Sequence, residues 1–147
     1  MESPFDDYYY MKKAMAEAEL AFEKDEVPVG ALIVSKQKII AKSHNLTELL
    51  CDVTAHAEMQ AITAAANYLG AKYLRSCTLY VTLEPCQMCA GALYWSQIGK
   101  VVYAAEDPKR GYRAMGASLH PRTQVDFGIL GKESRKLLRE FFDRKRL

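Results

Sequence analysis

Residues 78–89 read TLYVTLEPCQMC, and this stretch decides how the chain folds. Its first six residues are apolar, aromatic or β-branched throughout, which is the strongest strand signal in the sequence. Pro85 ends that strand and suits the first turn of a helix. We therefore predict a buried strand that leads directly into a helix carrying Cys86 and Cys89.

Helical and strand patterns alternate on both sides of this stretch. The predicted helices cover residues 8–22, a segment capped by Thr54 and stopped by Gly70, a segment from Pro85 to about residue 99, and a closing segment from about residue 133. The predicted strands cover residues 29–34, 39–41, 78–83, 101–104 and 124–127. This alternation predicts an α/β layered domain with a partly parallel sheet.

Composition indicates one ordinary soluble domain that covers residues 1–147. Half of the residues are hydrophobic and 26% are charged. No run of about 18 apolar residues is present, and the acidic N-terminus lacks the layout of a signal peptide. We therefore expect no membrane span and a cytoplasmic protein, in which the four cysteines are more often metal ligands or free thiols than disulfides.

Charge is unevenly distributed along the chain. Residues 1–74 contain 7 Lys and Arg against 11 Asp and Glu, whereas residues 75–147 contain 13 against 7. A basic C-terminal half points weakly to a polyanionic partner, and an ordinary solvated surface explains it equally well.

Two short motifs carry the chemistry. Residues 54–58 read TAHAE and residues 85–89 read PCQMC, which together form the H-x-E and P-C-x-x-C pattern of zinc-dependent nucleobase deaminases. We expect His56 in the first turn of one helix and Cys86 and Cys89 in the first turns of another. Cys86 and Cys89 are three residues apart, so the two sulfurs can face one metal ion. The positive end of a helix also favours the thiolate form there.

Three protein ligands leave the fourth position of a tetrahedral zinc open for water. Two thiolates neutralise the charge of the ion, so its water needs a nearby base, and Glu58 can serve as that proton shuttle. A structural zinc site would need a fourth ligand from Cys51, Cys77, His44 or His120, and no second pair has zinc-finger spacing. A redox pair would leave His56 and Glu58 without a role.

The sequence resembles bacterial tRNA-specific adenosine deaminases over nearly its whole length. The matching segments are PVGA at 28–31, HN at 44–45, TAHAE at 54–58, LEPC at 83–86, MCAGA at 88–92 and IGKVV at 98–102. The resemblance implies a three-layer α-β-α cytidine-deaminase-like fold with a central mixed five-stranded sheet. It also implies a homodimer with one zinc per subunit that converts the wobble adenosine of a tRNA anticodon to inosine.

The matching positions imply roles for individual residues. They imply that zinc is bound by His56, Cys86 and Cys89. They also imply that Glu58 transfers protons and that Asn45 recognises the base. The other implied substrate contacts are Val29 and Ala57 in the base pocket and Asp107 beside the neighbouring nucleotides. Residues 111–121 depart from the pattern of the family.

The closing segment gives a second indication of an RNA substrate. Its basic residues are predicted to share one side of the helix: Lys132, Arg135, Lys136, Arg139 and Arg146. Leu138, Phe141 and Phe142 face another side. Basic residues beside aromatic ones suit a single-stranded RNA loop, with Phe142 as a substrate contact. The alternative is that both phenylalanines pack in the core.

Two other functions remain open at this point. The same zinc motifs serve deaminases of free nucleobases or nucleosides, of the guanine or cytosine type. A non-catalytic RNA-binding or zinc-stabilised module is the second alternative, and the presence of Glu58 and an open ligand position disfavours it.

Overall fold

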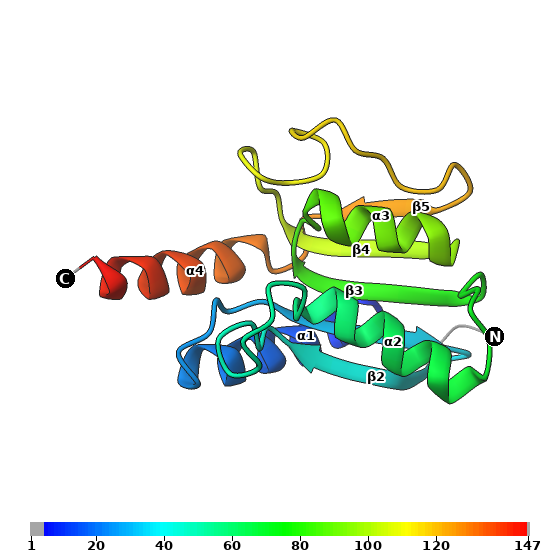
Figure 1. Cartoon of the computed structure of the whole chain (residues 1–147), viewed down its shortest axis with the longest axis horizontal. Coiled ribbons are helices and arrows are strands. Elements are labelled where there is room, and N and C mark those ends of the chain that lie inside the picture. Colours follow the sequence, from blue (N-terminus) through cyan, green and yellow to red (C-terminus); the bar gives the residue numbers. More distant parts are fainter. Residues whose placement is uncertain (1–4, 147) are drawn as a thin grey trace.

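The centre of the fold is one sheet of five strands in the order β2-β1-β3-β4-β5 (Figure 1). The computed structural model describes residues 5–146, so the first four residues of the acidic N-terminus lie outside it. The strands are β1 (Gly30–Ser35), β2 (Lys38–His44), β3 (Cys77–Leu83), β4 (Lys100–Ala105) and β5 (Gln124–Phe127). The helices are α1 (Asp7–Glu23), α2 (Ala57–Leu69), α3 (Gln87–Ser96) and α4 (Gly131–Lys145).

The sheet is mixed, as the resemblance implied. Strand β1 pairs antiparallel with β2 and with β3, whereas β3, β4 and β5 run parallel to one another. Adjacent parallel strands need a crossover connection, and α3 supplies the one between β3 and β4. Helices α2 and α3 cover one face of the sheet, and α1 and α4 contact the other face (Figure 1). The predicted three-layer α-β-α fold is confirmed.

Strand β3 contains no charged residue, and both of its faces are buried. Leu79 and Val81 point into the core beneath α2 and α3. Tyr80 points to the opposite face, into the smaller core under α1. Alternating side chains of this strand therefore pack into two different cores. This explains why residues 78–83 do not alternate between apolar and exposed polar residues.

Helix α2 begins later than predicted. It starts at Ala57 with His56 as its N-cap residue, so the assignment of Thr54 as the N-cap is wrong. Thr54 instead donates from its backbone N–H and its hydroxyl to the carboxylate of Asp52, at 2.8 and 2.7 Å. The predicted stop is confirmed, since Gly70 adopts a left-handed conformation with φ 64°.

Helix α3 is shorter than predicted. Its N-cap residue is Cys86, so Pro85 lies before the helix rather than in its first turn, and the helix ends at Ser96. Strand β2 is longer than predicted and includes His44. The later starts of α2 and α3 make one residue of each motif, His56 and Cys86, the N-cap residue of a helix.

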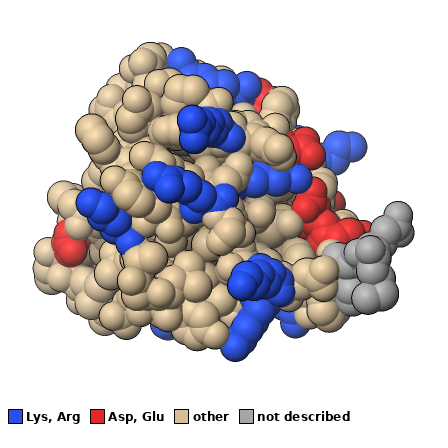
Figure 2. Space-filling view, turned by 90° about the vertical axis from the view of Figure 1, so that its right-hand side faces the viewer, with Lys and Arg blue, Asp and Glu red and all other residues tan. Residues whose placement is uncertain are grey.

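The C-terminal ends of β3 and β4 and the starts of α2 and α3 meet at one end of the sheet, on the left in Figure 1. The carboxyl ends of parallel strands are where α/β folds usually bind ligands. Figure 2 looks onto the opposite end, where Lys and Arg side chains are also spread. Positive charge by itself therefore does not mark the site. None of the helices within residues 5–146 is both long and apolar enough to span a membrane.

Candidate metal and substrate site

Three donor atoms come together where α2 and α3 begin. His56 is the N-cap residue of α2, Cys86 is the N-cap residue of α3, and Cys89 lies in the first turn of α3. Nδ1 of His56 lies 3.6 Å from Sγ of Cys86 and 3.5 Å from Sγ of Cys89. Within residues 5–146 this group, whose donor atoms all lie within 4.8 Å of one another, is the one that could hold a metal ion.

The spacing of these atoms fits zinc. Zinc bonds of about 2.0 Å to nitrogen and about 2.3 Å to sulfur, at a tetrahedral angle, place the two donor atoms roughly 3.6 Å apart. The two observed nitrogen–sulfur distances are 3.5 and 3.6 Å. A ligand set of one imidazole and two sulfurs is also one that zinc prefers.

The electrostatics of the group favour a negative charge on one sulfur, that of Cys86. The Cys89 thiol donates a hydrogen bond to the sulfur of Cys86, which lowers the pKa of Cys86 to about 4. The same hydrogen bond, together with burial, raises the pKa of Cys89. The hydrogen bond to Cys86 raises the pKa of His56. The lowered pKa favours the thiolate form of Cys86 at the N-terminus of α3, and the thiolate is the form that binds a cation.

Glu58 lies beside this group but belongs to a different part of the site. It is the second residue of α2, is only 4% exposed and lines the same pocket as His56 and Cys86. Burial raises the pKa of the Glu58 carboxyl to about 7. A carboxyl with a pKa near neutrality can both take up and release a proton at physiological pH.

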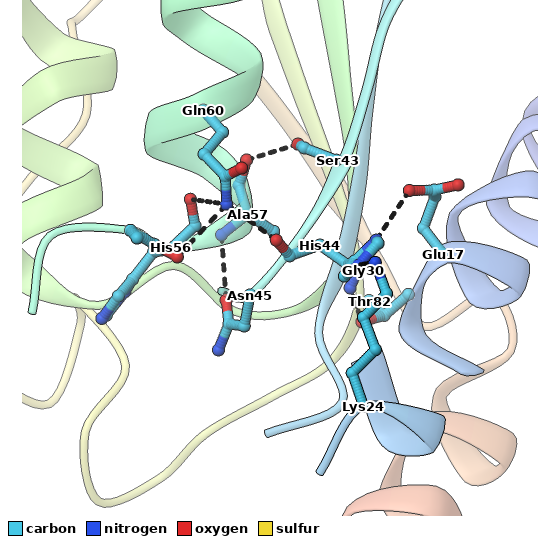
Figure 3. Close-up of polar contacts among 11 residues, drawn as sticks. Glu17, Lys24, Gly30, Ser43, His44, Asn45, His56, Ala57, Gln60 and Thr82 are labelled. Carbon is cyan, nitrogen blue, oxygen red and sulfur yellow. Dashed lines mark hydrogen bonds and ion pairs between the residues drawn. The ribbon is translucent and has the colours of Figure 1, made fainter. Parts of the chain in front are cut away.

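Asn45 is held in place by the start of α2 (Figure 3). Its Oδ1 atom accepts a hydrogen bond of 2.9 Å from the backbone N–H of Ala57. The Nδ2 atom points away from that hydrogen bond, and Asn45 lines the pocket. The side chain therefore offers hydrogen-bond donors, rather than an acceptor, to a molecule in the pocket.

Two further side chains fasten the end of β2 to the start of α2, and the motifs did not reveal them. The hydroxyl of Ser43 donates to the carbonyl of Ala57 at 2.6 Å. The amide nitrogen Nε2 of Gln60 donates to the carbonyl of His44 at 2.7 Å and to that of Ala55 at 3.2 Å (Figure 3). A polar residue inside an amphipathic helix gives no sequence signal of such a role.

The pocket has a volume of about 760 Å³. Its lining includes Glu58, Asn45, two of the three donor residues, His56 and Cys86, and also Val29. Ala57 is placed differently. Its side chain is fully buried in the core under α2, and it contributes to the site through its backbone N–H.

Helix α4 forms one side of the pocket. Arg135, Arg139 and Arg146 line the pocket, whereas Lys132 and Lys136 are exposed and do not. The two phenylalanines also separate. Phe141 is buried, 4% exposed, and packs against Phe22, whereas Phe142 is 41% exposed and lines the pocket. Core packing, the alternative considered for both rings, thus describes Phe141, whereas Phe142 stays a predicted substrate contact.

The segment between β4 and β5 forms the opposite side. Glu106, Asp107, Lys109 and Arg110 line the pocket there. The carboxylate of Asp107 accepts hydrogen bonds from the backbone N–H groups of Lys109 at 3.2 Å and Arg110 at 3.0 Å, which shapes the turn. Glu84 lies beneath this turn; burial alone would raise its pKa, but hydrogen bonds from Arg113 and from backbone N–H groups hold the pKa below its usual value.

Sequence comparison identifies the family. A family model described as MafB19-like deaminase matches residues 5–146. The tRNA-specific adenosine deaminase of Aquifex aeolicus is 48% identical over an alignment of length 144, and the match covers 94% of this chain and 95% of that protein. The chain belongs to the tRNA-specific adenosine deaminase family. The resemblance noted in the sequence is confirmed, and the chain is a hydrolytic deaminase.

Solved structures share the fold of this deaminase. A tRNA:A34 deaminase that edits the wobble position superimposes with a TM-score of 0.81 at 41% identity, covering 88% of this chain and 98% of that chain. A guanine deaminase from Nitrosomonas europaea superimposes with a TM-score of 0.78 at 25% identity, covering 96% of this chain and 85% of that one. The architecture is thus common to deaminases of different substrates, and the pocket walls must distinguish them.

Proposed function

We propose that this deaminase hydrolyses the wobble adenosine of a tRNA anticodon to inosine, acting as a single domain over residues 1–147. The observation that carries the proposal is the composition of the pocket. A metal-binding group and a buried carboxyl at its floor meet arginines and an exposed phenylalanine at its rim. The floor suits deamination, and the rim suits a nucleic-acid loop rather than a free base.

His56, Cys86 and Cys89 would hold one zinc ion, as the donor spacing supports. Zinc bound there supplies a Lewis acid that activates water for attack on C6 of the adenine ring. Glu58 is the group that moves protons. Its burial and raised pKa allow it to accept a proton from water and deliver it to the ring nitrogen. It can then take the second proton from the hydroxyl newly attached to C6 and pass it to the amino group, which leaves as ammonia when the C6–N bond breaks.

Asn45 and Val29 would hold the base in this pocket. The amide nitrogen of Asn45 can donate to an acceptor on the purine edge, because its oxygen is already bonded to Ala57. Val29 is 5% exposed and gives the ring an apolar surface.

The two sides of the pocket would bind the nucleotides around the flipped adenosine. Arg135, Arg139 and Arg146 present guanidinium groups to phosphates, and Phe142 offers a ring on which a base can stack. Asp107, in the turn opposite α4, would contact a neighbouring nucleotide. A tRNA substrate places this reaction in the cytoplasm.

The homodimer is part of the proposal. Trp95, on α3, is 76% exposed, and Val53 and Leu49, in the segment before α2, are 83% and 67% exposed. A dimer interface over these elements would remove the three apolar side chains from water. Sedimentation velocity should give a dimer for the wild type and a shift toward monomer for Trp95→Glu. A monomeric wild type at micromolar concentration would contradict the dimer.

One assay tests the substrate. The purified protein is given an anticodon stem-loop with adenosine at the wobble position, and separately free adenosine, cytidine and guanine, and the products are separated by chromatography. We expect turnover of the stem-loop and little turnover of the three small molecules. The Glu58→Ala protein serves as the control for contaminating activity. Efficient turnover of guanine with no activity on the stem-loop would establish the free-base alternative instead.

A further inference from the structure

Glu84 is a buried carboxylate that accepts hydrogen bonds from one segment, residues 107–113. Its side chain is 1% exposed. Oε1 accepts from the backbone N–H of Asp107 at 3.0 Å and from Nη2 of Arg113 at 3.0 Å. Oε2 accepts from the backbone N–H and from Nε of Arg113, both at 3.3 Å. A carboxylate removed from water needs such compensation, and residues 107–113 supply it.

The same segment is also fastened to the residues that follow Glu84. The backbone N–H of Tyr112 donates to the carbonyl of Pro85 at 2.8 Å, and Gly111 forms an antiparallel bridge with Cys86. A side chain at Gly111 would place its Cβ 2.3 Å from the carboxylate of Glu84. Only glycine allows this close approach, so the segment lies directly on Glu84 and on a residue of the metal-binding group.

Arg113 is oriented by more than its bond to Glu84. Its guanidinium lies 5.7 Å from the ring centre of Tyr103 and 5.4 Å from that of Phe127, and these rings stack on each other at 5.2 Å. Nη2 also contacts the carboxylate of Glu106 at 3.1 Å. Arginine stacked on aromatic rings and bound through two nitrogens to one carboxylate is held in a single orientation.

The segment that Glu84 and Arg113 hold is a wall of the pocket. Glu106, Asp107, Lys109 and Arg110 line the pocket, and Cys86 lines it from the other direction. The distance between this wall and the metal-binding group therefore depends on how residues 107–113 are fastened to residues 84–86. Glu84 also borders the pocket, but its side chain is only 1% exposed, which leaves almost no surface with which to bind RNA.

We propose that Glu84 and Arg113 are positioning residues that hold the wall formed by residues 106–113 at a fixed distance from the metal-binding group. The wall can then bind the nucleotides beside the target base in a productive arrangement. This assignment rests on the proposed function for the identity of the substrate. Neither residue takes part in the proton transfers. Their contribution is a preorganised wall, which lowers the cost of ordering the segment when RNA binds.

The sign of a charge change separates this proposal from direct RNA binding. Glu84→Gln removes a negative charge from the protein and, by electrostatics alone, strengthens RNA binding. It also places an amide donor where Oε1 or Oε2 accepts hydrogen bonds from residues 107 and 113. If the pair positions the wall, Glu84→Gln raises KM. Electrostatics alone would lower KM, so the two explanations predict opposite changes.

The kinetic experiment compares Glu84→Gln, Arg113→Gln and the double variant with the wild type on the anticodon stem-loop. We expect each single change to raise KM roughly 5- to 20-fold while kcat stays within about twofold. The KM of the double variant should be no higher than that of the single variant with the higher KM, because the two residues act as a unit. Arg122→Gln is the matched control: it removes the same charge as Arg113→Gln from an exposed residue outside the pocket, and its KM should stay near that of the wild type.

Arg113→Lys is a more conservative variant, to be used if the neutral substitution Arg113→Gln destabilises the protein. Lysine keeps the charge but cannot donate through two nitrogens in a fixed plane. We expect Arg113→Lys to raise KM by at least half the factor seen for Arg113→Gln. An unchanged or lowered KM in Glu84→Gln, or a loss confined to kcat in the variants, would overturn the proposal.

A second measurement does not depend on activity. Trypsin can cleave after Lys109 and Arg110, which lie in the wall, and mass spectrometry locates the cuts. We expect cleavage there to be at least fivefold faster in Glu84→Gln and Arg113→Lys than in the wild type or Arg122→Gln, at a temperature well below the melting point of each. Equal cleavage would overturn the positioning role even if the stem-loop is the substrate. A wild type inactive on the stem-loop would instead overturn the proposed function, while faster cleavage in the variants would still support the fastening of the wall.

Discussion

The side-chain oxygen of Asn45 accepts a 2.9 Å hydrogen bond from the backbone N–H of Ala57, the first residue of α2. Asn45 thereby does for α2 what an N-cap side chain normally does, from a position outside the helix. His56, the actual N-cap residue, makes no such bond. Its imidazole faces the two cysteines instead. One asparagine thus frees a histidine for metal binding and points its own nitrogen away from the helix.

Asn45→Asp separates these two tasks. The carboxylate can still accept the Ala57 hydrogen bond, so the melting temperature should stay within a few degrees of that of the wild type. The donor to the base is lost and a negative charge is added, so kcat/KM on the stem-loop should fall by about 100-fold. Asn45→Ala is the comparison, because it should lose the cap as well, at a cost of roughly 1 kcal/mol in unfolding free energy. Retained activity in Asn45→Asp would show that the nitrogen does not read the base.

Glu58→Gln tests the proton shuttle. The substitution keeps the shape of a buried side chain and removes its ability to exchange protons, so kcat should fall by about 10³-fold. Zinc content, measured by mass spectrometry of the metal, should remain one per subunit, because Glu58 is not one of the three donors. A variant that keeps normal turnover would exclude this mechanism.

The four cysteines should differ sharply in their effect on metal content. Cys86→Ser or Cys89→Ser should lose zinc and activity, since each removes one of three donors. Cys51→Ser is the matched control, because Cys51 is exposed and lies outside the donor group. A strong chelator should inactivate the wild type and lower its melting temperature, with recovery on adding zinc. Zinc retained by both Cys86→Ser and Cys89→Ser would argue for a different site.

Arg139 and Lys136 provide a pair of equal charge on one helix. Arg139 lines the pocket, and Lys136 is exposed away from it. Arg139→Gln should weaken stem-loop binding and reduce the slope of log K against log salt by about 0.7 to 0.9, the value for one phosphate contact. Lys136→Gln should change the slope by much less. Equal effects of the two substitutions would mean that α4 acts through its overall charge.

Phe142 and Phe141 should behave as opposites. Phe142→Ala should raise KM about tenfold with little change in stability, because it removes an exposed stacking surface from the pocket. Phe141→Ala should lower the unfolding free energy by roughly 3 kcal/mol, since Phe141 is buried and packs against Phe22. Chemical denaturation and steady-state kinetics on both variants distinguish these outcomes, and a destabilised Phe142→Ala would assign that ring to the core.

The chemistry at the floor of the pocket could be predicted from the sequence because its signals are local. The spacing of Cys86 and Cys89 and the position of Glu58 two residues after His56 depend only on the geometry of a helix start. The buried strand at residues 78–83 was equally predictable, since a continuous apolar run reports burial on both faces. These features involve residues close together in the chain.

The walls of the pocket depended on contacts between residues far apart in the chain. Nothing in the pattern around Thr54 indicates that Asn45 supplies the cap of α2, and nothing around Glu84 indicates that Arg113 will neutralise it. Periodicity predicts which side chains are buried, but the packing of the layers decides which of them meet. The sequence alone therefore determined the set of donor residues that could hold a metal, whereas the tertiary structure decided which arginines, which phenylalanine and which turn surround the pocket.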